Sequence, residues 1–258
     1  MIIKVCGMRD AENIREVAAL GVDMMGFVFW PESPRFVRMV SSQAGIIPDY
    51  SEERFRQAHA ASAASGPESP GPEVQDSNLK PQGSKLKVQS SKAPAPARVG
   101  VFVDEMPQTI VTRVYNYKLD YVQLHGEESR VMIENLRSTL VPDIAPGIKI
   151  IKALGVGSRE DVARARDYEG AVDLFLFDTH GPTQGGSGRQ FDWSVLDAYD
   201  GNTPFLLSGG IGPDDAARIR AFRHPQFAGV DLNSRFETEP GLKDVERLRA
   251  FIWAIQNS

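Results

Sequence analysis

The fold is decided by a pattern that is clearest in the stretch Phe205-Leu206-Leu207-Ser208-Gly209-Gly210-Ile211-Gly212-Pro213-Asp214. Its first three residues are large and apolar, which is typical of a short, buried strand of a parallel sheet. Pro213 and Asp214 favour a helix start, because proline has no amide to satisfy in the first turn and aspartate caps free amides there. The stretch therefore predicts a strand, a glycine-rich turn and a helix, the repeating unit of an α/β protein.

The same unit recurs along the chain. Short β-branched or aromatic runs predict eight strands, at Ile2–Cys6, Met24–Phe29, Arg98–Val103, Tyr121–Leu124, Ile148–Lys152, Leu174–Phe177, Phe205–Ser208 and Gly229–Leu232. Amphipathic segments predict helices between them, at Ala11–Leu20, Ser42–Ala58, Gln108–Tyr117, Arg159–Tyr168 and Asp215–Phe222. Eight such units fit a (β/α)8 TIM barrel better than an open doubly wound sheet. We therefore predict an α/β protein with a single (β/α)8 barrel domain, residues 1–258.

One stretch differs from the rest of the chain. Residues 59–97 contain six Pro, seven Ser and three Gly among 39 residues, and no aromatic residue. Such a segment cannot bury enough apolar surface to offset the entropy lost on ordering. We expect a disordered insertion between the second and third strands, and favour a plain solvated loop over a partner-binding segment, because long surface loops cost little stability.

Composition excludes several classes of function. The 258 residues carry 29 Lys and Arg against 34 Asp and Glu, a net charge of −5, without a basic run. This argues against nucleic-acid and membrane partners, since phosphate backbones are held by clustered cations. The single cysteine excludes an internal disulfide and a cysteine-based zinc site, and fits a reducing compartment. With no window of 18 apolar residues and no apolar leader, a cytoplasmic protein is expected.

Polar residues follow most of the predicted strands, and in a (β/α)8 barrel the active site lies at these carboxyl ends. They are Cys6, Trp30, Arg35, Asp104, His125, Lys152, Asp178, Ser208, Gly209, Gly210 and Asp231. A lone cysteine is more often a small buried apolar residue, but Gly7 directly after Cys6 leaves room for a ligand. Asp178 could merely cap a turn, although a carboxyl at the mouth of a barrel is suited to donate a proton.

Two glycine-rich stretches have separate interpretations. Gly209 and Gly210 lie after the seventh strand, where barrels commonly hold phosphate with backbone amides and a helix start, although a simple tight turn is the alternative. The stretch Gly181–Gly188 predicts a mobile cover over the site. The four histidines share no ligand spacing and nucleotide-binding motifs are absent, so we expect no metal and no cofactor.

The sequence resembles a known family, phosphoribosylanthranilate isomerase, a (β/α)8 enzyme of tryptophan biosynthesis. The resemblance covers most of the chain outside the insertion. It rests on Lys4-Val5-Cys6-Gly7-Met8, Phe29-Trp30-Pro31-Glu32-Ser33-Pro34-Arg35, Gly100-Val101-Phe102-Val103, Val122-Gln123-Leu124-His125-Gly126, Phe177-Asp178-Thr179, Gly185-Gly186-Ser187-Gly188, Phe191-Asp192-Trp193, Ser208-Gly209-Gly210-Ile211, Gly229-Val230-Asp231 and Asn233-Ser234. Each block alone is weak, but their shared order along eight strand ends is specific.

The resemblance implies an Amadori rearrangement of N-(5-phosphoribosyl)anthranilate to 1-(2-carboxyphenylamino)-1-deoxyribulose 5-phosphate. It implies that Asp178 is the general acid and that Cys6, as a thiolate, is the general base. An ordinary thiol pKa near 8.5 would need only a modest lowering for that role. It further implies that Arg35 binds the anthranilate carboxylate through its planar guanidinium.

The remaining residues implied to bind the substrate are His125, Asp231, Gly209, Gly210, Asn233 and Ser234. The sequence departs from the family after the last strand, where Asn233-Ser234-Arg235 replaces a pair of serines followed by glycine. Arg235 could add charge to the phosphate site, or form an ion pair with Glu237.

Two other hypotheses stay open. A sister phosphate-binding barrel enzyme of histidine or tryptophan biosynthesis would be expected to carry an Asp or a Lys where this chain has Cys6. A non-catalytic binding module would have no need of Cys6, Arg35 and Asp178 together. We expect a phosphorylated small molecule as substrate and a monomer or homodimer.

Overall fold

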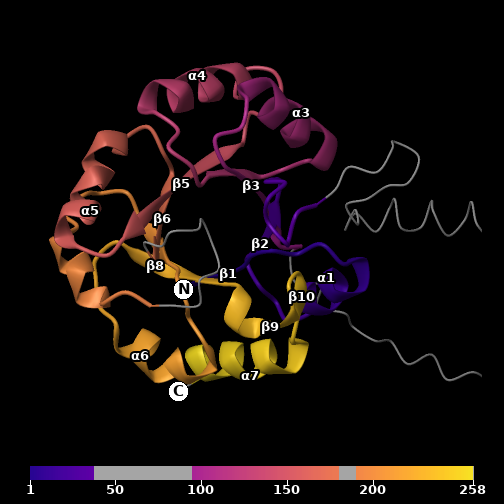
Figure 1. Ribbon diagram of the computed structural model, residues 1–258, viewed down its shortest axis with the longest axis vertical. Helices are drawn as coiled ribbons and strands as arrows, with labels where there is room; N and C mark the ends of the chain where they lie inside the picture. Colours follow the sequence, from indigo (N-terminus) through magenta and orange to yellow (C-terminus); the bar gives the residue numbers. More distant parts are fainter. Residues whose placement is uncertain (38–94, 180–189, 258) are drawn as a thin grey trace, which may run out of the picture. The chain divides into compact units, whose positions relative to one another are not determined.

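The computed structural model describes residues 1–37, 95–179 and 190–257. Eight parallel strands pair in chain order, and β8 pairs with β1 to close the barrel. They are β1 (Ile2–Val5), β2 (Met24–Val28), β3 (Ala97–Phe102), β4 (Tyr121–Leu124), β5 (Lys149–Val156), β6 (Leu174–Thr179), β7 (Phe205–Leu207) and β8 (Phe227–Leu232). Figure 1 shows these strands surrounded by the helices. The predicted α/β fold and (β/α)8 barrel are confirmed.

The helices of the described residues cover the outside of the barrel. They are α1 (Ala11–Ala18), α3 (Pro107–Tyr117), α4 (Arg130–Leu140), α5 (Arg159–Ala163), α6 (Ala216–Ala221) and α7 (Val245–Gln256). Short 3-10 turns add η1 (Arg164–Tyr168), η2 (Trp193–Ala198), η3 (Pro213–Asp215) and η4 (Ser234–Phe236), and a small hairpin adds β9 (Glu237–Glu239) and β10 (Leu242–Lys243). Asp10 and Ser158 cap the helices that follow them, as their positions in the sequence indicate.

Several predicted boundaries were wrong. The helix expected over Arg159–Tyr168 is α helix only to Ala163, and that expected over Asp215–Phe222 is the six-residue α6 preceded by a 3-10 turn. Ala97 opens β3, so the predicted insertion 59–97 extends too far, and its residues 59–94 lie outside the described residues. The helix expected at Ser42–Ala58 and the cover expected at Gly181–Gly188 also lie outside them.

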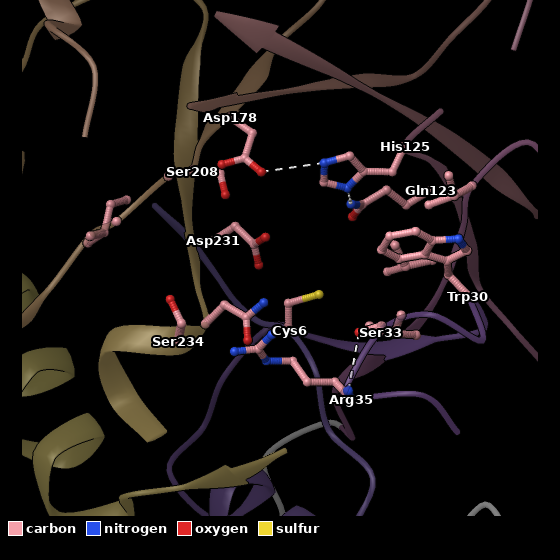
Figure 2. Close-up of a pocket in the computed structure, with 17 residues that line it drawn as sticks. Cys6, Trp30, Ser33, Arg35, Gln123, His125, Asp178, Ser208, Asp231 and Ser234 are labelled. Atoms are coloured by element: carbon pink, nitrogen blue, oxygen red, sulfur yellow. Dashed lines mark hydrogen bonds and ion pairs between the residues drawn. The ribbon is translucent and has the colours of Figure 1, made fainter. Parts of the chain in front are cut away.

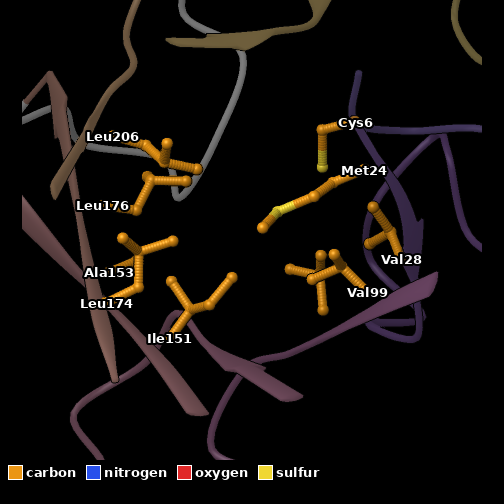
Figure 3. Packing of buried hydrophobic residues seen from close by; sticks show 10 residues of the cluster. Cys6, Met24, Val28, Val99, Ile151, Ala153, Leu174, Leu176 and Leu206 are labelled. Atoms are coloured by element: carbon orange, nitrogen blue, oxygen red, sulfur yellow. The ribbon is translucent and has the colours of Figure 1, made fainter. Parts of the chain in front are cut away.

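Side chains that alternate along the strands fill the interior of the barrel. This interior cluster contains Cys6, Met24, Val28, Val99, Val101, Ile151, Ala153, Leu174, Leu176 and Leu206, most of them labelled in Figure 3. On β5, for example, Ile151 and Ala153 face inward, so Lys152 between them faces the helices. Cys6 belongs to this cluster and also lines the pocket at the carboxyl ends of the strands. In the described ranges, no helix has the length and apolarity that crossing a membrane requires.

Candidate active site

One pocket lies at the carboxyl ends of the strands and gathers the predicted site residues. Those that line it are Cys6, Trp30, Arg35, His125, Asp178, Ser208, Gly209, Gly210, Asp231, Asn233 and Ser234. Figure 2 shows the labelled side chains around a common space, with Asp231 between Asp178 and Cys6 in this view. Cys6 directly follows β1, whereas Asp178 and Asp231 lie on β6 and β8, and they meet because the strands close into a barrel.

Two of the predicted strand-end residues do not line this pocket. Strand β5 continues to Val156, so Lys152 does not end it, and its ammonium donates to Glu128 Oε2 at 2.9 Å on the outer side of the barrel. The Asp104 carboxylate accepts the Glu127 amide at 2.7 Å, in a loop where Asp104 has a positive φ of 46°. Both residues support the turn between β4 and α4 rather than the pocket.

Cys6 lies beside a buried ion pair that the sequence analysis did not foresee. Lys4 precedes Cys6 by two residues on β1 and therefore faces the same side. Its Nζ donates to Asp231 Oδ1 at 2.9 Å, and its positive charge acts on the Cys6 thiol. Strand pairing sets this contact, because Lys4 and Asp231 are directly opposed in the register of β1 and β8. The group formed by Lys4, Cys6 and Asp231 is called the thiol cluster below.

Burial dominates the electrostatics of the thiol cluster. It raises the pKa of the Cys6 thiol, while the Lys4 ammonium opposes this rise and the Asp231 carboxylate adds to it. On balance these surroundings raise the pKa of the Cys6 thiol above its ordinary value. Burial also raises the pKa of the Asp231 carboxyl, against the attraction of Lys4. Gly26 makes room for the sulfur, since a Cβ there would lie 2.6 Å from Cys6 Sγ.

Asp178 is held on β6 by contacts to both of its oxygens. Oδ1 accepts the Thr179 amide at 2.8 Å, and Oδ2 lies 3.4 Å from His125 Nε2. Gln123 Nε2 lies 3.0 Å from His125 Nδ1. The His125 ring therefore lies between Gln123 and Asp178, with one ring nitrogen toward each (Figure 2). Gln123 thus orients the His125 ring, a role that the sequence analysis missed.

The glycine-rich turn after β7 is built for close approach. Gly209 and Gly210 have φ of 88° and 65°, in the left-handed region that favours glycine. A Cβ on Gly209 would collide with Thr179 Oγ1. The Gly212 amide is already bonded to Asp215 Oδ2 at 2.7 Å, and only the three-residue turn η3 follows. The Gly212 amide of the expected helix start is therefore already taken up within the turn.

The turn after β8 faces the same end of the pocket. Ser234 opens η4, and Asn233 Oδ1 accepts Lys243 Nζ at 2.8 Å, which orients the Asn233 side chain. Arg235 lies against the start of η3, where its Nε would be 3.7 Å from a Cβ on Gly212. The alternative ion pair between Arg235 and Glu237 does not form, because Glu237 is bonded to Arg35 and Lys243.

Arg35 reaches the pocket across Gly7 and is fixed by a residue that the sequence analysis did not assign to it. Its Nε and Nη2 donate to Glu237 Oε1 and Oε2 at 2.8 and 2.6 Å. A Cβ on Gly7, which has φ 79°, would lie 2.5 Å from Arg35 Cδ. Lys4, Gln123, Glu237 and Lys243 are thus the supporting residues missed. Lys4, two residues before Cys6, and Gln123, two residues before His125, carried a local signal.

The described part of the chain contains no candidate metal site. No group of three or more His, Cys, Asp and Glu side chains there could hold a metal ion.

Comparisons with known proteins identify the family. The profile described as N-(5'phosphoribosyl)anthranilate (PRA) isomerase matches residues 52–254. A protein of Parabacteroides distasonis named N-(5'-phosphoribosyl)anthranilate isomerase is 42% identical over 255 residues, 99% of this chain and 93% of that protein. The crystal structure of phosphoribosyl anthranilate isomerase from Thermotoga maritima is 30% identical, with a TM-score of 0.64 and 100% of both chains covered. A further crystal structure of this isomerase, 27% identical with a TM-score of 0.64 and the same coverage, is a complex with reduced 1-(o-carboxyphenylamino)-1-deoxyribulose 5-phosphate. The chain belongs to the N-(5'-phosphoribosyl)anthranilate isomerase family.

Proposed function

We propose that Cys6 is the general base and Asp178 the general acid with which this chain carries out the isomerisation that names its family. The reaction converts N-(5-phosphoribosyl)anthranilate to 1-(2-carboxyphenylamino)-1-deoxyribulose 5-phosphate, in tryptophan biosynthesis. The observation that carries the proposal is that the thiol and the carboxyl line one pocket together with Arg35 and the glycine-rich turn. An acid, a base and a group for each charged end of the substrate are thus available in one place.

The reaction needs one proton delivered and one removed. Asp178 gives a proton to the ring oxygen of the furanose, the ring C–O bond breaks, and the nitrogen lone pair forms an iminium at C1′. Cys6 takes the proton from C2′, and the freed electron pair forms the C1′=C2′ double bond of an enolamine. The enolamine then becomes the ketone as its hydroxyl proton is lost and C1′ is protonated. Overall no atom is gained or lost.

The surroundings of each group support these roles. The Lys4 ammonium favours the thiolate form of Cys6 against the cost of burial. His125, held by Gln123, contacts Asp178 Oδ2, and the Thr179 amide donates to Oδ1, so the carboxyl of the acid is fixed in position beside the pocket. Asp231 lies between acid and base in the view of Figure 2, where it can bind a sugar hydroxyl.

The two ends of the substrate have separate anchors in this proposal. Arg35 binds the anthranilate carboxylate, and Gly209, Gly210, Asn233 and Ser234 bind the phosphate. Because backbone and side-chain amides supply these donors, a protein of net charge −5 can hold a phosphate without a basic surface. The phosphorylated compound bound in the 27% identical relative supports this assignment.

The experiment uses the purified full chain and freshly prepared N-(5-phosphoribosyl)anthranilate, with turnover followed by the loss of its fluorescence. Wild-type turnover is expected, and Cys6→Ser and Asp178→Asn should each lower kcat by about 10²–10⁴-fold, as the loss of a general acid or base does. Asp197→Asn, the same change at an exposed carboxyl, is the matched control. Absence of wild-type turnover contradicts the proposed reaction, and near-normal kcat in both variants contradicts the assigned roles.

We infer a cytoplasmic protein that acts as a monomer or homodimer on a phosphorylated small molecule. The net acidity and the single cysteine support this setting. Sedimentation of the active protein distinguishes the two assembly states.

A further inference from the structure

The geometry points to Glu237 as a positioning residue that decides which edge of the Arg35 guanidinium meets the ligand. In this inference the carboxylate of the aromatic ring is received end-on, by Nη1 and Nη2 of Arg35. It rests on the proposed function, in which Arg35 binds that carboxylate. Glu237 itself touches no substrate atom and acts through Arg35.

The hydrogen bonds of Arg35 leave a single bidentate edge. A guanidinium offers two such edges, one formed by Nε and one Nη, the other by the two Nη atoms. Glu237 occupies the first, with Nε to Oε1 at 2.8 Å and Nη2 to Oε2 at 2.6 Å. The side chains of Arg35 and Glu237 are only 10% and 5% exposed, so this pair is not an exchangeable surface contact. A ligand carboxylate in the pocket can therefore be bound at two points only by Nη1 and Nη2.

Glu237 is itself held from three directions. Besides Arg35 Nε, its Oε1 accepts Lys243 Nζ at 2.6 Å and the Gly241 amide at 3.1 Å. Burial raises the pKa of the Glu237 carboxyl, but Arg35 and Lys243 together lower it below its ordinary value, so it is ionised at neutral pH. The carboxylate plane is thus fixed, and the plane of the guanidinium follows it.

The strand pair that carries Glu237 is anchored to the barrel. Lys243 on β10 exchanges two hydrogen bonds with Asn13 of α1, each 2.8 Å long. The Lys243 ammonium also binds Asn233 Oδ1, in the turn assigned to the phosphate. Gly7 fixes the other end of Arg35, because the aliphatic part of the arginine occupies the space where a Cβ would be. The position and the plane of the guanidinium are therefore both set before a ligand enters.

A purely electrostatic role predicts the opposite effect of substitution. Glu237 places a negative charge beside the site for a carboxylate, so removing that charge would strengthen ligand binding if only charge mattered. If Glu237 orients Arg35, removing its charge loosens the guanidinium and weakens binding. The sign of the change therefore separates the two explanations.

The experiment measures dissociation constants of the full chain for two probes, in wild type and in Glu237→Gln. The probes are reduced 1-(o-carboxyphenylamino)-1-deoxyribulose 5-phosphate and its counterpart without the ring carboxylate. In wild type, loss of the carboxylate should weaken binding about a hundredfold, as expected for a bidentate charged contact. In Glu237→Gln the same loss should weaken binding less than about tenfold, because the oriented contact is already impaired.

Controls separate positioning from a loss of folding. Glu239→Gln makes the same change two residues further along β9, at an exposed position, and should keep the hundredfold discrimination. Glu237→Asp keeps the charge and should retain more discrimination than Glu237→Gln, and it serves if Glu237→Gln does not fold. In turnover, Glu237→Gln should raise KM about tenfold and change kcat less than about threefold.

Equal discrimination in wild type and Glu237→Gln, or tighter binding in the variant, overturns the positioning role. Failure of the proposed function is distinguishable, because it appears as wild-type protein that binds the carboxylate-bearing probe but does not turn over N-(5-phosphoribosyl)anthranilate.

Discussion

Two buried lysine–carboxylate pairs in this barrel have almost the same geometry and different surroundings. Lys4 and Asp231 join β1 to β8, and Lys152 and Glu128 join β5 to the turn before α4, each with 2.9 Å between nitrogen and oxygen. All four side chains are at most 5% exposed. Distance and burial alone would therefore assign both pairs the same role.

The remaining hydrogen bonds distinguish them. Lys152 also donates to the carbonyls of Gly126 at 2.6 Å and Leu124 at 3.4 Å, and Glu128 accepts the amides of Gly126 and Asp104. The Lys152 pair thus closes a turn on the outer side of the barrel. In the described chain, the Lys4 ammonium donates a side-chain hydrogen bond to Asp231 and its charge acts on the Cys6 thiol, and Asp231 lines the pocket. A buried ion pair can therefore influence a reaction when a reactive side chain lies beside it. It is structural when backbone groups take up its remaining hydrogen bonds.

The largest effect should follow from breaking the structural pair. Lys152→Met leaves Glu128 buried without its partner, and the free energy of unfolding should fall by about 3–5 kcal/mol, measured by urea unfolding. The activity of the folded protein should stay unchanged, because the pair does not line the pocket. Lys152→Met with Glu128→Gln should recover part of the loss by removing the unpaired charge. A lowered kcat with intact stability would contradict the comparison.

A smaller effect is expected from crowding the thiol cluster. Gly26→Ala places a methyl group 2.6 Å from the present position of Cys6 Sγ, so the sulfur must move relative to Lys4. Overpacking of this kind should cost about 1–3 kcal/mol of stability and should also lower kcat/KM. Gly147→Ala is the control, since a Cβ at Gly147 meets nothing within 4 Å. Unchanged kcat/KM in a destabilised Gly26→Ala protein would separate packing from catalysis.

The thiol cluster also predicts pH shifts of opposite sign. Thiolate increases with pH, so kcat/KM should rise with pH through the pKa of Cys6. Lys4→Met removes a charge that lowers this pKa, and the rising limb should move to higher pH. Asp231→Asn removes a charge that raises it, and the limb should move to lower pH while Lys4 stays protonated. Lys4→Arg keeps the charge and is the control for Lys4→Met. Shifts in one direction for both variants would contradict the assignment.

The smallest effect belongs to a pair on the surface. Arg166 and Asp200 lie 2.6 Å apart, and their side chains are 65% and 64% exposed. Solvent screens such pairs, so Arg166→Ala should leave the melting temperature and the pH profile unchanged within error. A clear loss of stability would show that short distance matters more than the surroundings do.

Much of the barrel could be predicted from the sequence, because each strand is a short apolar run bounded by turn residues. Helices α4 and α7 were not predicted, although Ser129 and Asp244 cap them. The end of β5 was placed four residues early, at Lys152 rather than Val156. In strands buried on both faces, as where Ile150 and Ile151 are both buried, composition does not reveal which side faces inward. The side taken by Lys152 therefore needed the structure.

The residues of the candidate site likewise fall into those that the sequence could identify and those that it could not. Cys6, Arg35 and Asp178 could be identified because they follow strand ends in recognisable motifs. The partner of Arg35 could not, since Glu237 is 202 residues away and meets it only when the barrel closes. The orientation of the His125 ring likewise depends on its contact with Gln123, which is a matter of side-chain geometry.

The most direct test of the comparison is a titration of the thiol itself. Cys6 is the only cysteine, so NMR of protein with isotopically labelled cysteine reports one thiol as the pH is raised. We predict that the pKa of Cys6 rises in Lys4→Met and is unchanged in Lys152→Met. An unchanged pKa in Lys4→Met, or an equal rise in both variants, would contradict the claim that the Lys4 pair, and not the Lys152 pair, serves the thiol.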